Sequence, residues 1–152
     1  MAEVEQLEIE GRVYALRTMP PLQALAFAPK VATMLAGVLT GQLEQLARSY
    51  RAGNLAAMGA VVLELLPKIP AEQFTALARE AFGYEVYAGN AKLSDNTHFT
   101  NWFRDHPGDL LPVASWAIWS HAKPYFLESP AGFKAAFIGG GFQYPTDGKQ
   151  TT

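Results

Sequence analysis

Apolar and polar residues alternate along the first segment of the chain, from residue 7 to residue 15, and the alternation breaks at Glu10-Gly11. A period of two residues is typical of a half-buried strand, and a short break that contains glycine favours a tight turn. The pattern therefore predicts a β-hairpin that turns at Glu10-Gly11. The second strand should end before Pro20, because proline cannot donate a hydrogen bond to a neighbouring strand.

From Leu22 onward the apolar residues recur every three or four positions, which is the period of an amphipathic helix. Proline and glycine divide this region into predicted helices at residues 21–38, residues 43–50, residues 55–66 and a fourth that begins at Pro70. Pro29 lies inside the first helix, where it removes a backbone hydrogen bond. We therefore expect a kink or a break near Phe27.

A second alternating segment, YEVYAGNAKLS at residues 84–94, predicts another β-hairpin. The next helix can be capped by Asp95 or Asn96, whose side chains accept hydrogen bonds from free amide groups at a helix start. That helix should stop at Pro107-Gly108. Asp109 can then cap a last helix in the same way.

These elements define the predicted fold class, which is an α+β domain, predominantly α-helical, with about six helices and two small β-hairpins. A chain of 152 residues suggests a single domain that can bury a sizeable core. We place that domain at residues 1–138. The last segment, residues 139–152, has no apolar period and is predicted to be a flexible C-terminal tail.

Residues 98–126 contain all three tryptophans and all three histidines of the chain. On the last predicted helix, one broad apolar stripe should face the core, and it consists of Leu110, Val113, Ala114, Ala117, Ile118, His121 and Tyr125. Trp119 lies nearly opposite this stripe and Trp116 lies close to Trp119, so the helix is apolar on two sides. Such a helix is either central in the core or shared between its own domain and a partner.

Two interpretations of the aromatic residues remain open from the sequence. In the first, the last two helices form a hairpin that encloses the tryptophans. In the second, Trp116 and Trp119 stay partly exposed and anchor a partner, because aromatic residues dominate the energetics of protein interfaces. The candidate partner contacts are Trp102, Phe103, Trp116, Trp119 and Phe126. Phe27 and Met34 are candidates for a second apolar contact, although a core role is the simpler interpretation of both.

Composition and motifs exclude several classes of function. The chain has no cysteine, which excludes disulfides and thiolate metal sites. A net charge of −2 gives no basic excess for nucleic acid, and no apolar run is long enough to span a membrane. His98, His106 and His121 lack the spacing of a zinc-binding helix. We therefore expect no enzymatic activity and no metal or cofactor, and neither nucleic acid nor a membrane as a partner.

Three segments of the chain resemble the tail assembly chaperones of tailed bacteriophages. They are LEIEGRVYALRTMPPLQALAFAPKV, YEVYAGNAKLS and HFTNWFRDHPGDLLPVASWAIWSHAKPYF, which together span about residues 7–126. The resemblance implies a non-catalytic protein that binds the phage tape measure protein and keeps it soluble until the tail tube polymerises around it. It also implies action in the bacterial host cytoplasm and absence from the mature virion. The tail tube protein and a second copy of the chain are further candidate partners.

Two other classes of protein remain alternatives. A structural virion protein, such as a tail or head–tail adaptor, would also need adhesive surfaces without a catalytic motif, but it would form rings and remain in purified particles. A small enzyme or metal protein would require His98, His106 and His121 to meet in the fold. The resemblance and the missing motifs favour the chaperone.

Overall fold

A computed structural model describes residues 4–38, 45, 48, 49 and 51–127 of the chain. Its elements, with η for 3-10 helices, are β1 (Val4–Ile9), β2 (Arg12–Arg17), α1 (Pro21–Ala36), α3 (Leu55–Leu65), η1 (Leu66–Lys68), α4 (Ala71–Phe82), β3 (Val86–Ala88), β4 (Ala91–Lys92), α5 (Asn96–Asp105), η2 (Pro107–Asp109) and α6 (Leu110–Leu127). The predicted helix-dominated α+β class is confirmed. Most of the helix expected at residues 43–50, the domain end at residue 138 and the tail at residues 139–152 lie outside the described residues.

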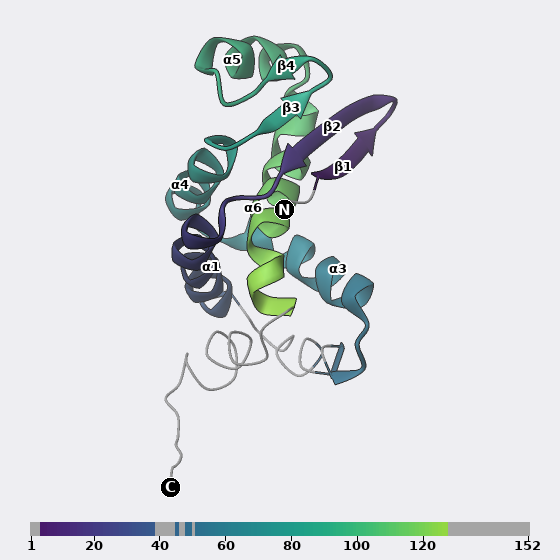
Figure 1. The fold of residues 1–152 in the computed structure, drawn as a ribbon, viewed down its shortest axis with the longest axis vertical. Coiled ribbons are helices and arrows are strands. Elements are labelled where there is room, and N and C mark those ends of the chain that lie inside the picture. The colour runs from purple at the N-terminus through teal and green to yellow at the C-terminus, as the bar shows by residue number, and fades with distance from the viewer. Residues whose placement is uncertain (1–3, 39–44, 46–47, 50, 128–152) are drawn as a thin grey trace, which may run out of the picture.

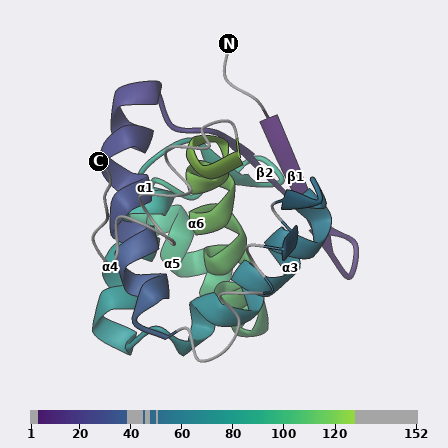
Figure 2. The ribbon, with the colours of Figure 1, turned by 90° about the horizontal axis from the view of Figure 1, so that it is seen from below.

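Helix α6 lies at the centre of the molecule, and the other helices and the sheet surround it (Figure 1, Figure 2). It packs against α1, α3 and α4 and also against β1. Every residue from Val113 to Ala122 is buried. The helix is apolar all round because each of its faces meets another element, which is the central-core arrangement that its pattern allows.

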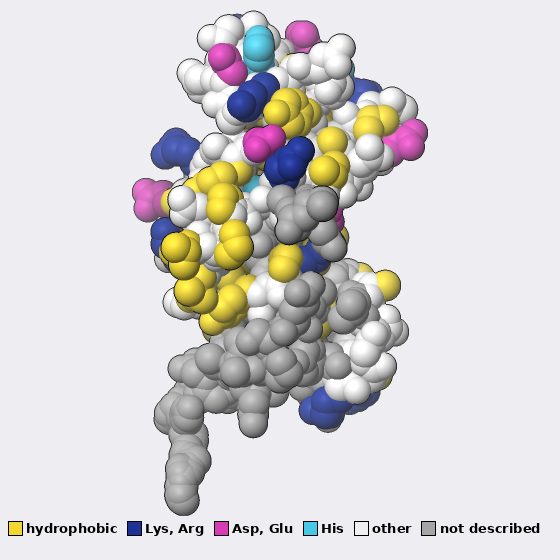
Figure 3. All heavy atoms as spheres, viewed as in Figure 1, with side chains coloured by type: hydrophobic (Ala, Val, Ile, Leu, Met, Phe, Trp, Pro, Cys, Tyr) yellow, Lys and Arg dark blue, Asp and Glu magenta, His cyan; other side chains and the backbone are white. Residues whose placement is uncertain are grey.

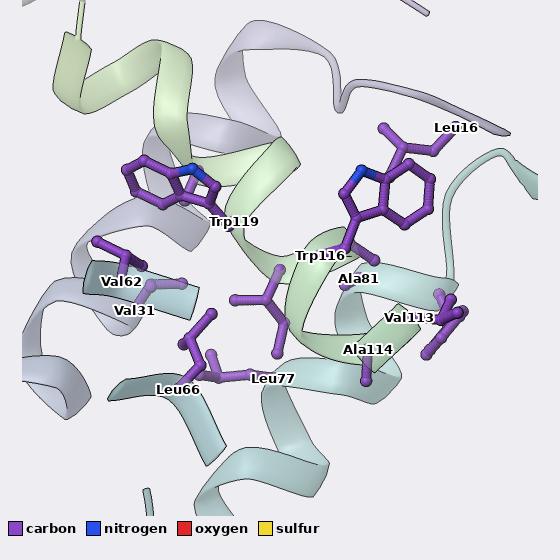
Figure 4. Packing of buried hydrophobic residues seen from close by; sticks show 14 of the residues in the cluster. Leu16, Val31, Val62, Leu66, Leu77, Ala81, Val113, Ala114, Trp116 and Trp119 are labelled. Carbon is purple, nitrogen blue, oxygen red and sulfur yellow. The ribbon is translucent and has the colours of Figure 1, made fainter. Parts of the chain in front are cut away.

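The two tryptophans of α6 belong to this core (Figure 4). Trp116 is 8% exposed and Trp119 is 5% exposed. In the close-up, Trp116 lies beside Leu16 of β2. Trp119 approaches α3, where a Cβ atom added at Gly59 would lie 3.2 Å from its indole nitrogen. Of the two interpretations that the sequence left open, burial in the core is therefore correct for these two tryptophans, and partial exposure is wrong.

Both predicted hairpins are confirmed, and they join into one antiparallel sheet with the order β1-β2-β3-β4. The first hairpin turns at Glu10 and Gly11, whose φ angles are 49° and 85°. Positive φ at both central residues is the geometry of a tight two-residue hairpin turn. The hairpins meet where Tyr14 and Leu16 of β2 pair with β3, so the sheet connects the start of the chain with its middle.

Helix α1 continues through Pro29, so the break that was one of the two predictions near Phe27 does not occur, and a kink there stays a prediction. Proline deprives the carbonyl of Leu25 of its intrahelical donor. Leu25 and Pro29 both lie on the exposed face of α1, where water can take the place of that donor. Phe27 is fully buried and Met34 is half-buried against the core, in agreement with a core role for both.

Asp109 does not cap α6, contrary to the prediction, because its carboxylate is turned toward the sheet. It accepts two hydrogen bonds from Arg12, Nε to Oδ2 at 2.6 Å and Nη2 to Oδ1 at 3.0 Å. It also accepts a hydrogen bond from the hydroxyl of Tyr14, which itself accepts one from the indole N–H of Trp102 at 3.0 Å. This network ties β2 to α5 and to the start of α6.

His121 is fully buried and connects α6 with α4 and with the segment between β2 and α1. Its Nδ1 accepts a hydrogen bond from the backbone amide of Met19 at 3.1 Å, and its Nε2 lies 3.1 Å from the carbonyl oxygen of Ala81. An acceptor at Nδ1 and a donor at Nε2 define a neutral ring. Burial lowers the pKa of His121 to about 4, although the hydrogen bond to Ala81 opposes this shift.

A candidate partner-binding groove

An apolar groove opens between α4, α5 and the start of α6, with a volume of about 590 Å³. The described residues that line it are Phe74, Thr75, Ala78, Arg79, Phe82, Gly83, Leu93, Ser94, Asn96, Phe99, Pro107, Leu110, Leu111 and Ala114. Concave, mainly apolar surfaces of this size, with a few polar groups at the edge, are the usual binding sites of proteins. The groove is therefore the candidate functional site.

Aromatic rings from α4 and α5 pack together at the groove. The ring centroids of Phe82 and Phe99 lie 4.9 Å apart, as do those of Phe99 and Phe103, and Phe82 and Phe103 lie 5.9 Å apart. Tilted and edge-to-face rings at these distances attract one another beyond the effect of burial alone. Phe82 and Phe99 line the groove, and the buried Phe103 supports both of them, so the two helices present a fixed apolar surface.

The wall that α6 contributes is held by the network around Asp109. Leu110 and Leu111 follow Asp109 directly and are 38% and 49% exposed. The hydrogen bonds from Arg12 hold the pKa of Asp109 below its usual range, although burial opposes the shift. The carboxylate therefore stays charged at neutral pH, keeps its bonds to Arg12, and fixes the first turn of α6 beside the groove.

Arg79 is the only charged residue among the described residues that line the groove. It is exposed and lies in the last turn of α4. The neighbouring Glu80 is engaged elsewhere, because its Oε1 lies 3.2 Å from Nζ of Lys30 on α1. The groove thus combines an apolar lining with one positive charge.

A second apolar surface lies on the outer face of α1. Leu22 is 79% exposed and Leu25 is 50% exposed, and Ala26 and Pro29 are exposed on the same face. Figure 3 shows hydrophobic side chains gathered over α1 and α4 on one side of the molecule. Large exposed leucines that share one face of a helix favour a further contact surface on α1.

The structure does not bring the five sequence-predicted contact residues together at the groove. Trp116 and Trp119 lie in the core, and the side chain of Phe126 lies outside the described residues. Trp102 is half-buried and hydrogen-bonded to Tyr14. Phe103 is buried, but it touches two rings that line the groove. A direct role of these residues in partner contact stays a prediction.

The hydrophobic pattern of the chain did not indicate the residues that form the groove. It assigned Leu110 to the core stripe and did not single out Leu111, an apolar residue that falls outside that stripe. An apolar residue with no predicted place in the core, such as Leu111, was the available sign of an exposed apolar surface. Arg79 gave no such signal, because its place at the groove depends on how α4 meets α5 and α6.

The three histidines occupy separate environments. His98 is exposed near the start of α5, whereas His106 packs on Trp102 with ring centroids 4.4 Å apart. His121 is in the core. Within the part of the chain that the structure describes, no group of three or more His, Asp or Glu side chains is arranged to hold a metal ion. None of the described helices is long and apolar enough to cross a membrane.

The fold defines a small helix-dominated α+β domain, built around one central helix and carrying an open apolar groove. The chain belongs to a family of phage tail assembly chaperones, because the family model described as "Phage tail assembly chaperone protein, TAC" matches residues 10–120. The resemblance drawn from the sequence is thereby confirmed. The family assigns the chain a role in phage tail assembly. The chain matches no curated protein and no solved structure.

Proposed function

We propose that this chain binds the tape measure protein of its phage through the groove between α4, α5 and α6. It keeps that protein soluble until the tail tube polymerises around it. The observation that carries the proposal is an open apolar groove on a member of a tail assembly chaperone family. The chain acts without a catalytic step in the cytoplasm of the bacterial host, and it leaves before the virion is complete.

The physical reasoning concerns apolar helices that lack a partner. A tape measure protein is a long chain whose apolar helical stripes have no partner before the tube forms, and exposed stripes of this kind aggregate. An apolar groove covers one such stripe when residues spaced three and four apart enter it. Several weakly bound copies are easier to displace than one tight complex, because affinity differences lie mainly in dissociation rates.

Leu110 and Leu111 would meet the bound stripe, because they are exposed at the groove on a helix turn that Asp109 fixes. Phe103 and Trp102 have a supporting role in this proposal. Phe103 packs against the lining residue Phe99, and Trp102 belongs to the network around Asp109. Substitutions at these two positions would therefore change the groove indirectly.

Co-expression with the tape measure protein of the same phage, followed by size-exclusion chromatography, tests the proposal. We expect the tape measure protein to become soluble and to elute together with this chain. A tape measure protein that stays insoluble while this chain elutes alone would contradict the proposal. Mass spectrometry of purified virions separates the chaperone from a structural adaptor, since an adaptor stays in the particle.

A matched pair of variants tests the groove itself. Leu110→Glu places a charge in the groove and should abolish co-elution, whereas Leu63→Glu on α3 lies outside the groove and should leave it unchanged. The two leucines are 38% and 37% exposed, so the loss of buried apolar surface should be similar and small. The helix dipole favours a glutamate in the first turn of α6 and disfavours one in the last turn of α3, so the extra cost to folding falls on the control variant. Equal loss of binding in both variants would contradict the assignment of the groove.

A further inference from the structure

Arg79 lines the groove and has no acidic partner in the part of the chain that the structure describes. Arg12, Arg17, Lys30 and Lys123 each lie within ion-pair distance of a carboxylate. Arg79 forms no hydrogen bond or ion pair with any residue in the described ranges, although Glu80 is adjacent in sequence. Within the described part of the chain, its guanidinium is thus an unpaired positive charge among the apolar side chains of the groove.

We propose that Arg79 makes the groove selective for a helix that carries a carboxylate beside its apolar stripe. The proposal rests on the function proposed above, because the helix belongs to the tape measure protein. The apolar stripe fills the space along Phe74, Phe99 and Leu111, and a Glu or Asp at the flank of the stripe reaches Arg79. The planar guanidinium binds a carboxylate through two parallel hydrogen bonds, which sets the orientation of the helix as well as its charge.

The net charge of the chain and the local charge of the groove have opposite signs. With a net charge of −2, the protein as a whole does not attract an acidic segment. A single cation at the groove reverses this preference locally, and the surrounding apolar surface reduces its screening by water once the helix is bound. Apolar helices without a flanking acid, or with a flanking Lys or Arg, leave Arg79 unpaired or repelled and bind less tightly.

A structural role is the other explanation of Arg79, because a cation in the last turn of a helix offsets the helix dipole. The chain contains a matched case in Arg104, which is exposed in the last turn of α5 but does not line the groove. A dipole effect would act at both arginines alike. Recognition of a carboxylate would act at Arg79 alone.

The experiment measures binding of the full-length protein to overlapping peptides that tile the tape measure protein. We expect the tightest peptides to carry an acid beside an apolar stripe. Arg79→Gln should weaken their binding roughly fivefold and Arg79→Glu about tenfold or more, with a larger effect at low salt. Arg104→Glu should bind like the wild type. A peptide with its flanking Glu changed to Arg should recover binding to the Arg79→Glu variant.

The possible outcomes separate this inference from the proposed function. If Arg79→Glu binds every peptide like the wild type while Leu110→Glu binds none, the groove binds the tape measure protein and the selectivity for an acid is wrong. If the wild type binds no peptide, the function and the inference both fail. Phe133 and Phe137 are apolar residues that directly precede the predicted C-terminal tail. If the variant in which both are replaced by serine binds peptides more tightly and Arg79→Glu has no effect, the groove serves the chain's own C-terminal segment. If the groove instead binds a second copy of the chain, the protein forms a dimer. Leu110→Glu then dissociates this dimer, whereas added peptides do not. Either result overturns the inference.

Discussion

His121 and Tyr14 are polar side chains in the centre of an apolar core, and each is satisfied there by hydrogen bonds. His121 binds backbone groups of Met19 and Ala81, and the hydroxyl of Tyr14 donates to Asp109 and accepts from Trp102. Removing one partner of a buried hydrogen bond leaves the other unsatisfied, which costs more than the bond itself contributes. These residues therefore specify how the first strands and α4 meet α6.

The free energy of unfolding should decrease as the pH is lowered, because of His121. The folded ring takes up a proton only near pH 4, whereas the unfolded ring has a pKa near 6.5. Below pH 6.5 the unfolded chain binds the extra proton and is favoured. The contribution is fully present above pH 6.5 and is lost as the pH falls toward 4, by at most about 3 kcal/mol in the free energy of unfolding. Urea unfolding at a series of pH values measures it.

The matched controls for this pH dependence are His121→Gln and His98→Gln. His121→Gln should be less stable at neutral pH and should lack the wild-type fall between pH 6.5 and 4. His98→Gln, at an exposed position, should keep it. Parallel pH profiles for wild type and His121→Gln would show that His121 does not set the pH dependence.

Tyr14→Phe tests the network that fixes the start of α6. The substitution keeps the buried ring and removes only the hydroxyl between Asp109 and Trp102, so we expect a loss of about 1–2 kcal/mol in unfolding free energy. Tyr87→Phe, at a half-buried position on the neighbouring strand β3, is the matched control and should be nearly neutral. The same loss in both variants would assign the effect to tyrosine removal in general.

Close approach between two helices shapes the molecule at the scale of its elements. Gly59 allows α3 to lie against Trp119 of α6, since even one added carbon would come within 3.2 Å of the indole nitrogen. Gly59→Val should therefore destabilise the fold by about 1–3 kcal/mol through overpacking. Ala60→Val is exposed on the same helix and should cost less than 1 kcal/mol, mainly through helix propensity. Thermal unfolding of both variants compares the two effects.

Local chemistry explains which elements the sequence predicts well. The hairpin turn at Glu10-Gly11 and the cap at Asp95, which accepts hydrogen bonds from the amides of Thr97 and His98, depend only on neighbouring residues. The union of the two hairpins into one sheet was not predicted, because the pairing of β2 with β3 has no signature in either segment alone. The continuous α1 differs from the predicted break because the cost of Pro29 depends on its exposure.

The candidate site was harder to predict because it depends on tertiary contacts. Trp119 lies opposite the core stripe of α6, and a single helix cannot show that α3 covers that side. Asp109 stands where a cap is expected, yet Arg12, far away in sequence, binds its carboxylate. The aromatic residues were predicted as partner contacts, but Trp116 and Trp119 lie in the core. The open surface is formed by Leu110 and Leu111 together with side chains of α4.

At the scale of the whole molecule, polar links tie the beginning of the chain to α6 and the turn before it. They join Lys123 to Glu5 at 2.7 Å, Arg12 to Asp109 at 2.6 Å, and the amide of Met19 to His121 at 3.1 Å. The apolar core around α6 includes residues from the sheet and from α1, α3 and α4. The described core should therefore unfold as one cooperative unit.

Native-state hydrogen exchange measures this cooperativity. Amides of α6 and those that pair β2 with β3 should exchange with the same, highest free energy, because neither element is stable without the other. Amides of β4, which is only two residues long, should exchange faster. A sheet that exchanges at a clearly lower free energy than α6 would show that the two open independently.

The central position of α6 has a consequence for the order of events during translation. Ribosomes release a chain from its N-terminus at about 5–20 residues per second. Strand β2 is complete at Arg17, but α6 ends at Leu127, so the first hairpin and α1 wait roughly 5–20 s for the helix that covers them. During that interval the nascent chain exposes the apolar surface of its own future core, and a protein proposed to protect others from aggregation is itself open to aggregation until its last described helix is made.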